Sequence, residues 1–125
     1  MDTIERDDFL NRYMAMWHEP DAVKRRALVE DLWAGDAENL TRNFTVRGTE
    51  AIVARVAKAH EEWVAHQGLI FRPAGPTDGH NHLIRFTWEM VPRAGGAAQA
   101  RGLDIFVLDE DGRIRSLYQF TQPLA

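Results

Sequence analysis

The chain has 125 residues, 45% of them apolar, which is the length and composition of one domain with a buried core. Its 15 lysines and arginines stand against 19 aspartates and glutamates, so a formal net charge of −4 disfavours nucleic acid as a partner. The absence of cysteine excludes disulfides, thiolate zinc sites and cysteine nucleophiles, and it favours a cytoplasmic location.

No membrane segment or secretory signal is predicted. The first ten residues are acidic and interrupted by charges, unlike the basic start and apolar stretch of a signal peptide. The longest apolar run is Ile105 to Leu108, far below the roughly 20 residues that span a bilayer. We therefore expect neither a membrane partner nor secretion.

The first predicted element is an amphipathic helix from Ile4 to Trp17, with Asp2 or Thr3 as its N-cap. Large apolar residues recur along one of its faces at helical spacing: Phe9, Tyr13, Met16 and Trp17. Such a stripe predicts packing against the rest of the domain.

A second helix is predicted to begin near Pro20, which suits a first turn, and to end at Gly35. The short connection makes it antiparallel to the first. Its buried side is expected to hold Val23, Ala27, Leu28, Val29, Leu32 and Trp33. Residues Glu38 to Arg47 are interpreted as an irregular, partly extended link.

The third predicted helix begins with Thr49 as its cap and runs to about Gly68. One side of it carries Ile52, Val56, His60, Trp63 and Val64. From Leu69 onwards the apolar period changes from about 3.6 to 2.

Turn signals at residues 73–79, 95–96 and 109–112 divide the remainder into four strands. In the strand from Leu83 to Met90, apolar and polar residues alternate, so one face is buried and the other is wet. Helices followed by hairpin strands predict a single α+β domain over residues 1–125, with the helices on one side of the sheet.

Asp104 is the strongest candidate for chemistry. By alternation it shares a strand face with Ala98, Ala100, Gly102, Phe106 and Leu108, so small and apolar residues surround a carboxyl group. Burial there would raise its pKa, as a general acid or a neutral hydrogen-bond donor requires. The alternative is an aspartate that faces solvent or pairs with an arginine such as Arg85, Arg101 or Arg115.

Aromatic residues and one histidine could complete a pocket around Asp104. His60, at the centre of the third helical stripe, could act as an acid, base or ligand donor, or be an ordinary core histidine. The aromatic side chains could line a cavity or simply form core. These candidates are Tyr13, Trp17, Trp33, Trp63, Trp88 and Phe106.

Two motifs resemble metal sites without the residues that a site needs. His80-Asn81-His82 has no third ligand nearby and is interpreted as a hairpin tip. In Asp109-Glu110-Asp111-Gly112, the first position of a calcium loop would be Val107, which cannot ligate through its side chain. We expect no metal and no cofactor.

The chain resembles the SnoaL-like branch of the nuclear-transport-factor-like superfamily, which includes ketosteroid isomerases, scytalone dehydratase and polyketide cyclases. The resemblance covers nearly the whole chain and is carried by segments in a fixed order: Tyr13 to Trp17 with Pro20-Asp21, Leu32 to Ala37, Arg47 to Ile52, Ile84 to Glu89 and Leu108 to Ile114. It implies a cone-shaped, curved antiparallel sheet with three helices on its concave face, a cystatin-like α+β roll, around an apolar cavity.

The resemblance also implies roles for individual residues. Tyr13 falls where isomerase-type members keep an oxyanion-hole tyrosine, and Asp104 where they keep a protonated aspartic acid. Their proton-shuttling carboxylate aligns with Thr41, and neither Asp nor Glu lies between Glu38 and Glu50. This departure favours a cyclase-like role, in which a strand aspartate is the acid/base.

We therefore expect a pocket protein for a small apolar, carbonyl-bearing molecule, either a cofactor-independent cyclase, isomerase or lyase or a non-catalytic binder. In the catalytic reading, Asp104 is the acid/base and Tyr13 or His60 stabilises charge on oxygen. Trp17, Trp33, Trp63, Trp88 and Phe106 would contact the ligand. A third alternative is an association module that forms a homodimer through the open face of the sheet.

Overall fold

The computed structural model describes residues 1–124, which form three α-helices, a π-helical segment and a seven-stranded sheet. The first half contains α1 (Thr3–His18), α2 (Ala22–Leu32), β1 (Trp33–Leu40), β2 (Thr45–Arg47), α3 (Thr49–Ala59) and the π-helix η1 (His60–His66). The second half contains β3 (Leu69–Pro73), β4 (Asp78–His80), β5 (Leu83–Pro92), β6 (Ala100–Leu108) and β7 (Ile114–Gln122). Within the described range, no helix is long and apolar enough to cross a membrane.

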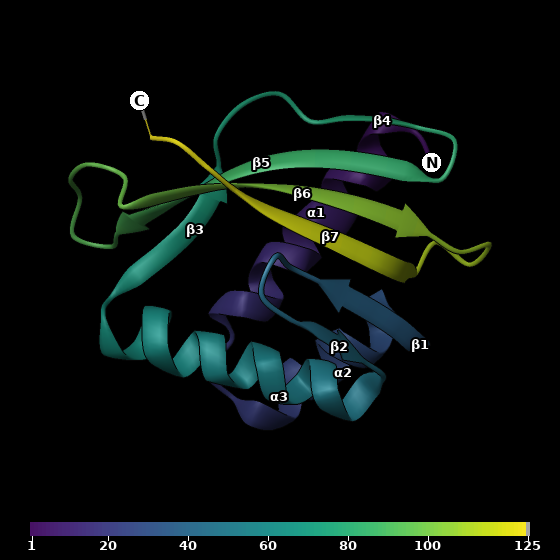
Figure 1. Ribbon diagram of the computed structural model, residues 1–125, viewed down its shortest axis with the longest axis horizontal. Coiled ribbons are helices and arrows are strands. Elements are labelled where there is room, and N and C mark those ends of the chain that lie inside the picture. Colours follow the sequence, from purple (N-terminus) through teal and green to yellow (C-terminus); the bar gives the residue numbers. More distant parts are fainter. Residues whose placement is uncertain (125) are drawn as a thin grey trace.

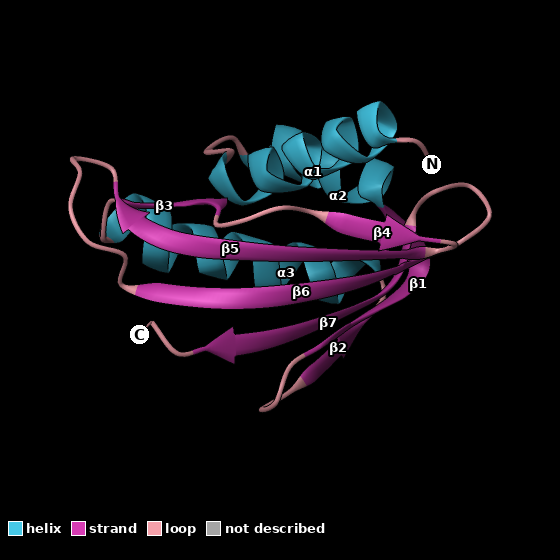
Figure 2. Cartoon of the chain, turned by 90° about the horizontal axis from the view of Figure 1, so that it is seen from above, coloured by secondary structure: helices cyan, strands magenta, loops and turns pink. Residues whose placement is uncertain are grey.

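The strands form one curved sheet in the order β2-β1-β7-β6-β5-β3, with β4 also paired to β5. All neighbours are antiparallel except β1 and β7, which run parallel. The long strands β5, β6 and β7 bend around the helices, which lie on the concave side (Figure 1). Figure 2 shows the same layers from above, with α1 and α2 against one side of the sheet. This is the expected cone-shaped α+β architecture.

The first helix forms where the apolar stripe predicts it. Asp2 caps its start, because the Asp2 side chain accepts a hydrogen bond of 2.8 Å from the backbone N–H of Glu5. Its buried face packs into the concave side of the sheet and holds Phe9, Leu10, Tyr13, Met16 and Trp17. Tyr13 meets Phe106 of β6 edge to face, with ring centroids 4.7 Å apart.

The predicted alternation holds along β6 and in the first half of β5. Ile84, Phe86 and Met90 of β5 are buried, whereas Arg85 between them is exposed. The hairpin turns lie at the predicted positions, and β5, β6 and β7 pair over most of their lengths. The two-residue period therefore turns one face of these strands towards the core.

The second helix differs from the prediction at both ends. Asp21 is the cap, so Pro20 precedes the helix, and the chain leaves the helix after Leu32 and enters β1 before Gly35. Its predicted buried side is partly wrong, since Val23 is 80% exposed and Ala27 is exposed as well. Arg25 is buried in their place.

The guanidinium of Arg25 is satisfied by backbone rather than by a carboxylate. It donates to the carbonyl oxygens of Glu19 and Pro20 at 2.9 and 3.2 Å, across the turn between α1 and α2. An arginine on the inner side of α2 therefore holds the helical hairpin together.

The link predicted over Glu38 to Arg47 is instead part of the sheet. Strand β1 begins at Trp33 and forms a hairpin with β2, in which Glu38 pairs with Arg47. On its other edge β1 joins β7 from the far end of the chain. A further short strand, β4, overlaps the end of the turn predicted at residues 73–79 and pairs with β5.

The third helix begins one residue earlier than predicted and changes its winding. Gly48, at φ 87°, is the N-cap, and Thr49 is the first helical residue. At His60 the α-helix becomes a π-helix that ends at His66. The wider turns change which residues of this segment share a face, and Trp63 is only half-buried.

Candidate functional site

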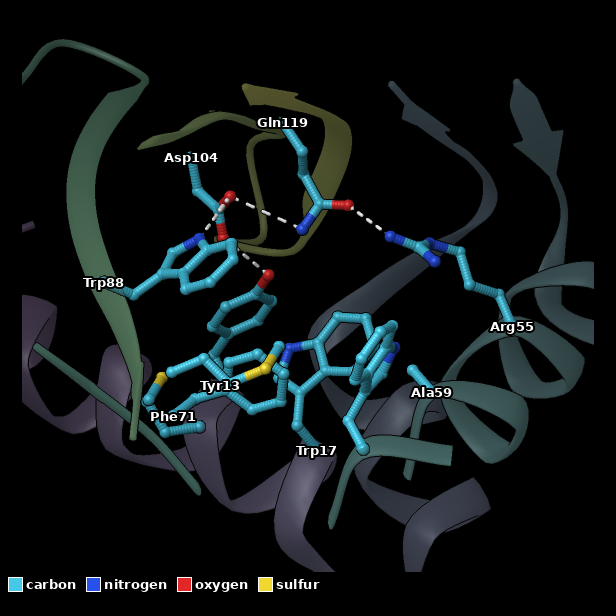
Figure 3. Close-up of a pocket in the computed structure, with 11 residues that line it drawn as sticks. Tyr13, Trp17, Arg55, Ala59, Phe71, Trp88, Asp104 and Gln119 are labelled. Atoms are coloured by element: carbon cyan, nitrogen blue, oxygen red, sulfur yellow. Dashed lines mark hydrogen bonds between the residues drawn. The ribbon is translucent and has the colours of Figure 1, made fainter. Parts of the chain in front are cut away.

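Asp104 lies at the centre of the concave face, in the middle of β6, with 0% of its surface exposed. Its Oδ2 accepts a hydrogen bond of 2.8 Å from the Tyr13 hydroxyl. Its Oδ1 accepts from Trp88 Nε1 at 3.0 Å and from Gln119 Nε2 at 3.4 Å. Three elements, α1, β5 and β7, thus converge on one buried carboxyl group, as Figure 3 shows.

Burial raises the pKa of Asp104 to about 6, although hydrogen bonds from Trp88, Tyr13 and Gln119 lower it in part. The carboxylate form therefore predominates at neutral pH, and the protonated form is accessible. This differs from the permanently protonated aspartic acid of the isomerase-type pattern. A group that can take up and return a proton near pH 7 suits acid/base chemistry.

Tyr13 stays protonated beside this carboxylate. Burial, followed by the charge of Asp104, raises the pKa of Tyr13 well above its ordinary value. The hydroxyl is therefore a donor at any physiological pH, aimed at Asp104 and supported from behind by the ring of Phe106.

Trp88 reaches Asp104 because residue 102 has no side chain. A Cβ at Gly102 would lie 2.2 to 2.8 Å from atoms of the Trp88 indole, which is closer than carbon atoms approach without displacement. Gly102 and Trp88 are partners in the β5–β6 register, and the indole lies across the glycine. The glycine next to the acid on the same strand face therefore positions a donor for it.

A second layer of polar groups extends from Asp104 towards α3. Gln119 Oε1 accepts from Arg55 Nη2 at 2.7 Å and from Asn39 Nδ2 at 3.0 Å. Arg55 Nε also donates to Asn39 Oδ1. Gln119 thus donates to Asp104 with one end and accepts with the other, so it connects the acid to the arginine (Figure 3).

Asp104 and Tyr13 face a cavity of about 130 Å³. Its remaining walls are mostly aromatic and aliphatic: Met14, Trp17, Ala59, Trp63, Phe71, Trp88 and Met90, together with Arg55 and Gln119. An apolar cavity of roughly 150 Å³ is enough for benzene. The cavity therefore suits a molecule of about one ring, and it is smaller than the roughly 300 Å³ at the lower end for drug-sized ligands.

A wider groove of about 790 Å³, lined mainly by the β1–β2 turn and β7, adjoins the cavity, and the two share Arg55, Trp88 and Gln119. Thr41, the position where isomerase-type enzymes keep a carboxylate, lines this groove and not the inner cavity. Its hydroxyl is bonded to the backbone of Asn43 and Phe44 in the β1–β2 turn. Thr41 therefore has a structural role in the turn and supplies no base.

The structure brings five of the candidate residues together at the cavity, namely Asp104, Tyr13, Trp17, Trp63 and Trp88. Three others lie outside its lining. Phe106 packs beneath Tyr13, and Trp33 is buried with its indole N–H 3.3 Å from the sulfur of Met16.

His60, the third, is buried behind the cavity. Its Nδ1 lies 2.8 Å from the carbonyl oxygen of Trp17, a contact that ties the start of η1 to α1. His60 therefore sits as a satisfied core histidine.

Arg55, Gln119 and Asn39 were not among the sequence candidates. Arg55 lies in the helical stripe between Ile52 and Val56, and Gln119 follows the buried Leu117 by two residues, so each sits on an inward face. A polar residue on an inward face is a feature of the sequence that can point to the site. Their mutual contacts were not predictable, because they join β1, α3 and β7 across 64 and 80 residues of sequence.

The two motifs that resemble metal sites are turns. Within residues 1–124 there is no group of three or more histidine, cysteine or acidic side chains that could hold a metal ion. His80 ends β4 and contacts Asn81, whose φ of 55° makes the turn into β5. Asp109 binds the backbone of Asp111 and Arg113 and closes the β6–β7 hairpin.

No protein-family model and no curated protein matches the chain. Solved structures do. A SnoaL-like protein of Agrobacterium tumefaciens C58, proposed to be an isomerase, is 29% identical over 93% of this chain and 96% of its own, with a TM-score of 0.83.

Two more distant structures share the fold. A protein of Sinorhizobium meliloti proposed to be a polyketide cyclase is 17% identical, covers 96% of this chain and 100% of its own, and has a TM-score of 0.70. A SnoaL-like protein of unknown function from Burkholderia thailandensis is 13% identical over 98% and 99% of the two chains, with a TM-score of 0.73.

Proposed function

We propose, from the premise that this chain is a SnoaL-like protein of the NTF2-like superfamily, that it catalyses a cofactor-independent proton transfer on a small carbonyl-bearing molecule. One observation carries the proposal. Asp104 is fully buried, its pKa is about 6, and it borders a cavity whose walls are otherwise mainly apolar. A desolvated carboxylate in such a site is a stronger base than one in water.

In the proposed step, the Asp104 carboxylate removes a proton from the carbon next to the ligand carbonyl. The C–H bond breaks, its electron pair forms the enolate, and Asp104 becomes a carboxylic acid. That acid then returns the proton to another carbon in an isomerisation, to the alkoxide formed when the enolate attacks a second carbonyl in a ring closure, or to the leaving group that the enolate expels in an elimination. Proton and charge balance without any oxidant, reductant or bound group.

Tyr13 supports the developing enolate in this scheme. In the resting site its hydroxyl donates to Asp104 Oδ2 at 2.8 Å. Once Asp104 has taken up the proton, the attraction for that hydroxyl weakens and it can donate to the enolate oxygen instead. The high pKa of Tyr13 ensures that the hydroxyl still carries its proton at that moment.

The reaction class follows from which acids and bases are available. A two-carboxylate isomerase mechanism lacks its second group, because Thr41 stands at that position and lies outside the inner cavity. A mechanism with one acid/base, as in the cyclase-like reading, uses the groups that are present. The cavity of about 130 Å³ favours a substrate with one ring over a fused-ring steroid.

A non-catalytic binder is the alternative, and one observation favours it. Both oxygens of Asp104 already accept hydrogen bonds from protein donors. In this reading, the network fixes the cavity shape and no proton moves. A carboxylate has about four acceptor sites, so three hydrogen bonds leave one site on Asp104 that can take a proton from a ligand.

Exchange of α-hydrogens tests the proposal without knowledge of the product. Small cyclic ketones and 1,3-diketones are incubated with the protein in D₂O, and loss of the α-proton signals is followed by NMR. We expect exchange to be accelerated and the acceleration to fall roughly 100-fold or more in Asp104→Asn, as for loss of a general base. Acceleration by Asp104→Asn equal to that by the wild type would contradict the proposed step and favour the binder.

A further inference from the structure

Arg55 stands where the inner cavity opens into the outer groove, and it lines both. It projects from α3 and is half-buried. Aromatic rings flank its guanidinium, with the Trp17 ring centroid at 5.5 Å and the Phe44 centroid at 4.8 Å. Any ligand that extends from the cavity to the groove therefore passes this cation.

The charge of Arg55 has no ion-pair partner within residues 1–124. Its hydrogen bonds go to two neutral amides, from Nε to Asn39 and from Nη2 to Gln119. Every ion pair of the described chain involves one of five other arginines, and none involves Arg55: Arg12, Arg26, Arg47, Arg72 and Arg101. The arginine at the cavity is thus oriented by neutral amides, and the charge of Asp104 acts on it without forming an ion pair.

A partly buried guanidinium without an ion pair costs folding free energy, and an anionic ligand bound to Arg55 would offset this cost. Burial lowers the pKa of Arg55, which shows that the guanidinium is partly desolvated, and the charge of Asp104 compensates it only in part. The third guanidinium nitrogen, Nη1, makes no hydrogen bond to any described residue, whereas Nε and Nη2 do. A planar guanidinium with one free edge beside an apolar cavity is suited to a carboxylate.

We propose that the ligand of this cavity is a small carboxylate, with its apolar ring among the aromatic walls and its anionic end on Arg55. This inference rests on the cavity being the ligand site of the proposed function, and it names the ligand class. A ring fills the space available, and a single carboxylate matches Arg55, the one cation that lines both the cavity and the groove in the described chain. The expected ligand is therefore apolar at one end only.

Paired probes that differ in charge but not in shape test the inference by binding alone. Benzoate is compared with benzamide, and cyclohexanecarboxylate with its amide, by calorimetry at neutral pH and millimolar ligand. We expect wild type to bind each acid roughly tenfold or more tightly than its amide, as a charge-assisted hydrogen bond provides. Equal affinity for acid and amide, or no binding of either acid, would overturn the inference.

Substitutions then identify the cation responsible. Arg55→Gln keeps donors for the neighbouring amides but removes the charge, so the preference for acids should vanish; Arg55→Lys should retain part of it. Arg47→Gln removes one positive charge from the neighbouring β2, outside cavity and groove, and should leave the preference intact. A preference that survives in Arg55→Gln, or that Arg47→Gln abolishes equally, contradicts the proposal.

Because the readout is binding, its failure is distinct from failure of the proton-transfer step. Asp104→Asn is expected to keep or increase the preference for acids, since Arg55 still carries its charge and the negative charge of Asp104 no longer opposes an anion. If Asp104→Asn abolishes α-hydrogen exchange while acids and amides bind equally to wild type, the proposed function stands and this inference falls. If α-hydrogen exchange is equally fast in Asp104→Asn while wild type prefers acids to amides, the anion site stands and the catalytic base is rejected.

Discussion

Asp104 depends on residues with no acid/base chemistry of their own. Gly102 leaves the space that Trp88 occupies, and Phe106 supports the ring of Tyr13, so two of the three donors to the carboxylate are held by its neighbours on β6. Burial raises the pKa of the acid while these donors lower it, and the resulting value of about 6 reflects both. The same contacts therefore determine the shape of the cavity and the strength of the base.

The raised pKa predicts a dependence of stability on pH. Between about pH 4 and about pH 6, native Asp104 holds a proton that the unfolded chain has already released, so raising the pH through this range favours unfolding. Relative to Asp104→Asn, wild type should lose on the order of 3 kcal/mol of unfolding free energy over this range. Urea unfolding of both proteins at several pH values measures the difference.

The comparison with Asp104→Asn removes the contributions of other titrating groups, which both proteins share. Tyr13 and Arg55, the titratable side chains nearest to the acid, keep their protons throughout this range. A difference in stability that stays constant with pH would mean that Asp104 titrates at the same pH in the folded and unfolded chain.

Part of this site is visible in the sequence. The alternation in β6 puts Asp104 among Gly102, Phe106 and Leu108, and the stripe of α1 points Tyr13 inwards, both of which the structure reproduces. Local patterns do not show which residues from distant segments contact Asp104. Gln119 looks like one more polar residue on an outer strand until β7 pairs with β6 and its amide meets Asp104.

At the scale of elements, the errors of prediction fall where tertiary contacts override local preference. Strand β1 contains Gly35 and two acidic residues and has no β-branched side chain, so its sequence does not favour a strand. It becomes one because β7 and β2 pair with its two edges. The long strands β5 to β7, with their alternation and marked turns, were predictable from the sequence alone.

Two valines of α2 that differ in burial test which face of the helix packs inwards. Val23 and Val29 both belong to the apolar pattern, but Val23 is 80% exposed and Val29 is buried. We expect Val29→Ala to cost about 2 kcal/mol of unfolding free energy, and Val23→Ala about 0.5 kcal/mol or less. Chemical denaturation of the two variants beside wild type measures both costs.

Similar losses in the two variants would contradict this orientation of α2. The buried Arg25 explains why the apolar pattern does not predict the buried face of α2 correctly. Its stem packs inwards while its head binds the carbonyl groups of Glu19 and Pro20, so a charged residue occupies a position that the pattern would give to an aliphatic one.

At the scale of the whole molecule, the convex face of the sheet is more apolar than a solvated face requires. Tyr118 and Phe120 of β7 are 41% and 53% exposed, and alternate residues of β6 beside them are only half-buried: Leu103, Ile105 and Val107. The helices cover only the concave side (Figure 2). We propose that a second copy of the chain covers this face in a two-fold symmetric dimer.

Sedimentation tests the dimer. We expect wild type to sediment as a dimer at micromolar concentration, and the double variant Tyr118→Glu with Phe120→Glu as a monomer, because two charges would be buried in the interface. Ile4→Glu, at an 81% exposed position on α1, is the control and should remain dimeric. A wild-type monomer at these concentrations would refute the dimer and leave the cavity and its chemistry unaffected.

The proposed proton transfer depends most directly on the pKa of Asp104 in the folded protein. Carbon-13 NMR of the aspartate carboxyl groups, titrated with pH and compared with Asp104→Asn to identify the resonance, measures that pKa. We predict a resonance that is missing from the variant and titrates with a midpoint near 6. A midpoint close to 4, the ordinary value for aspartate, would contradict the account, since Asp104 would then be a weak base unsuited to removing a proton from carbon.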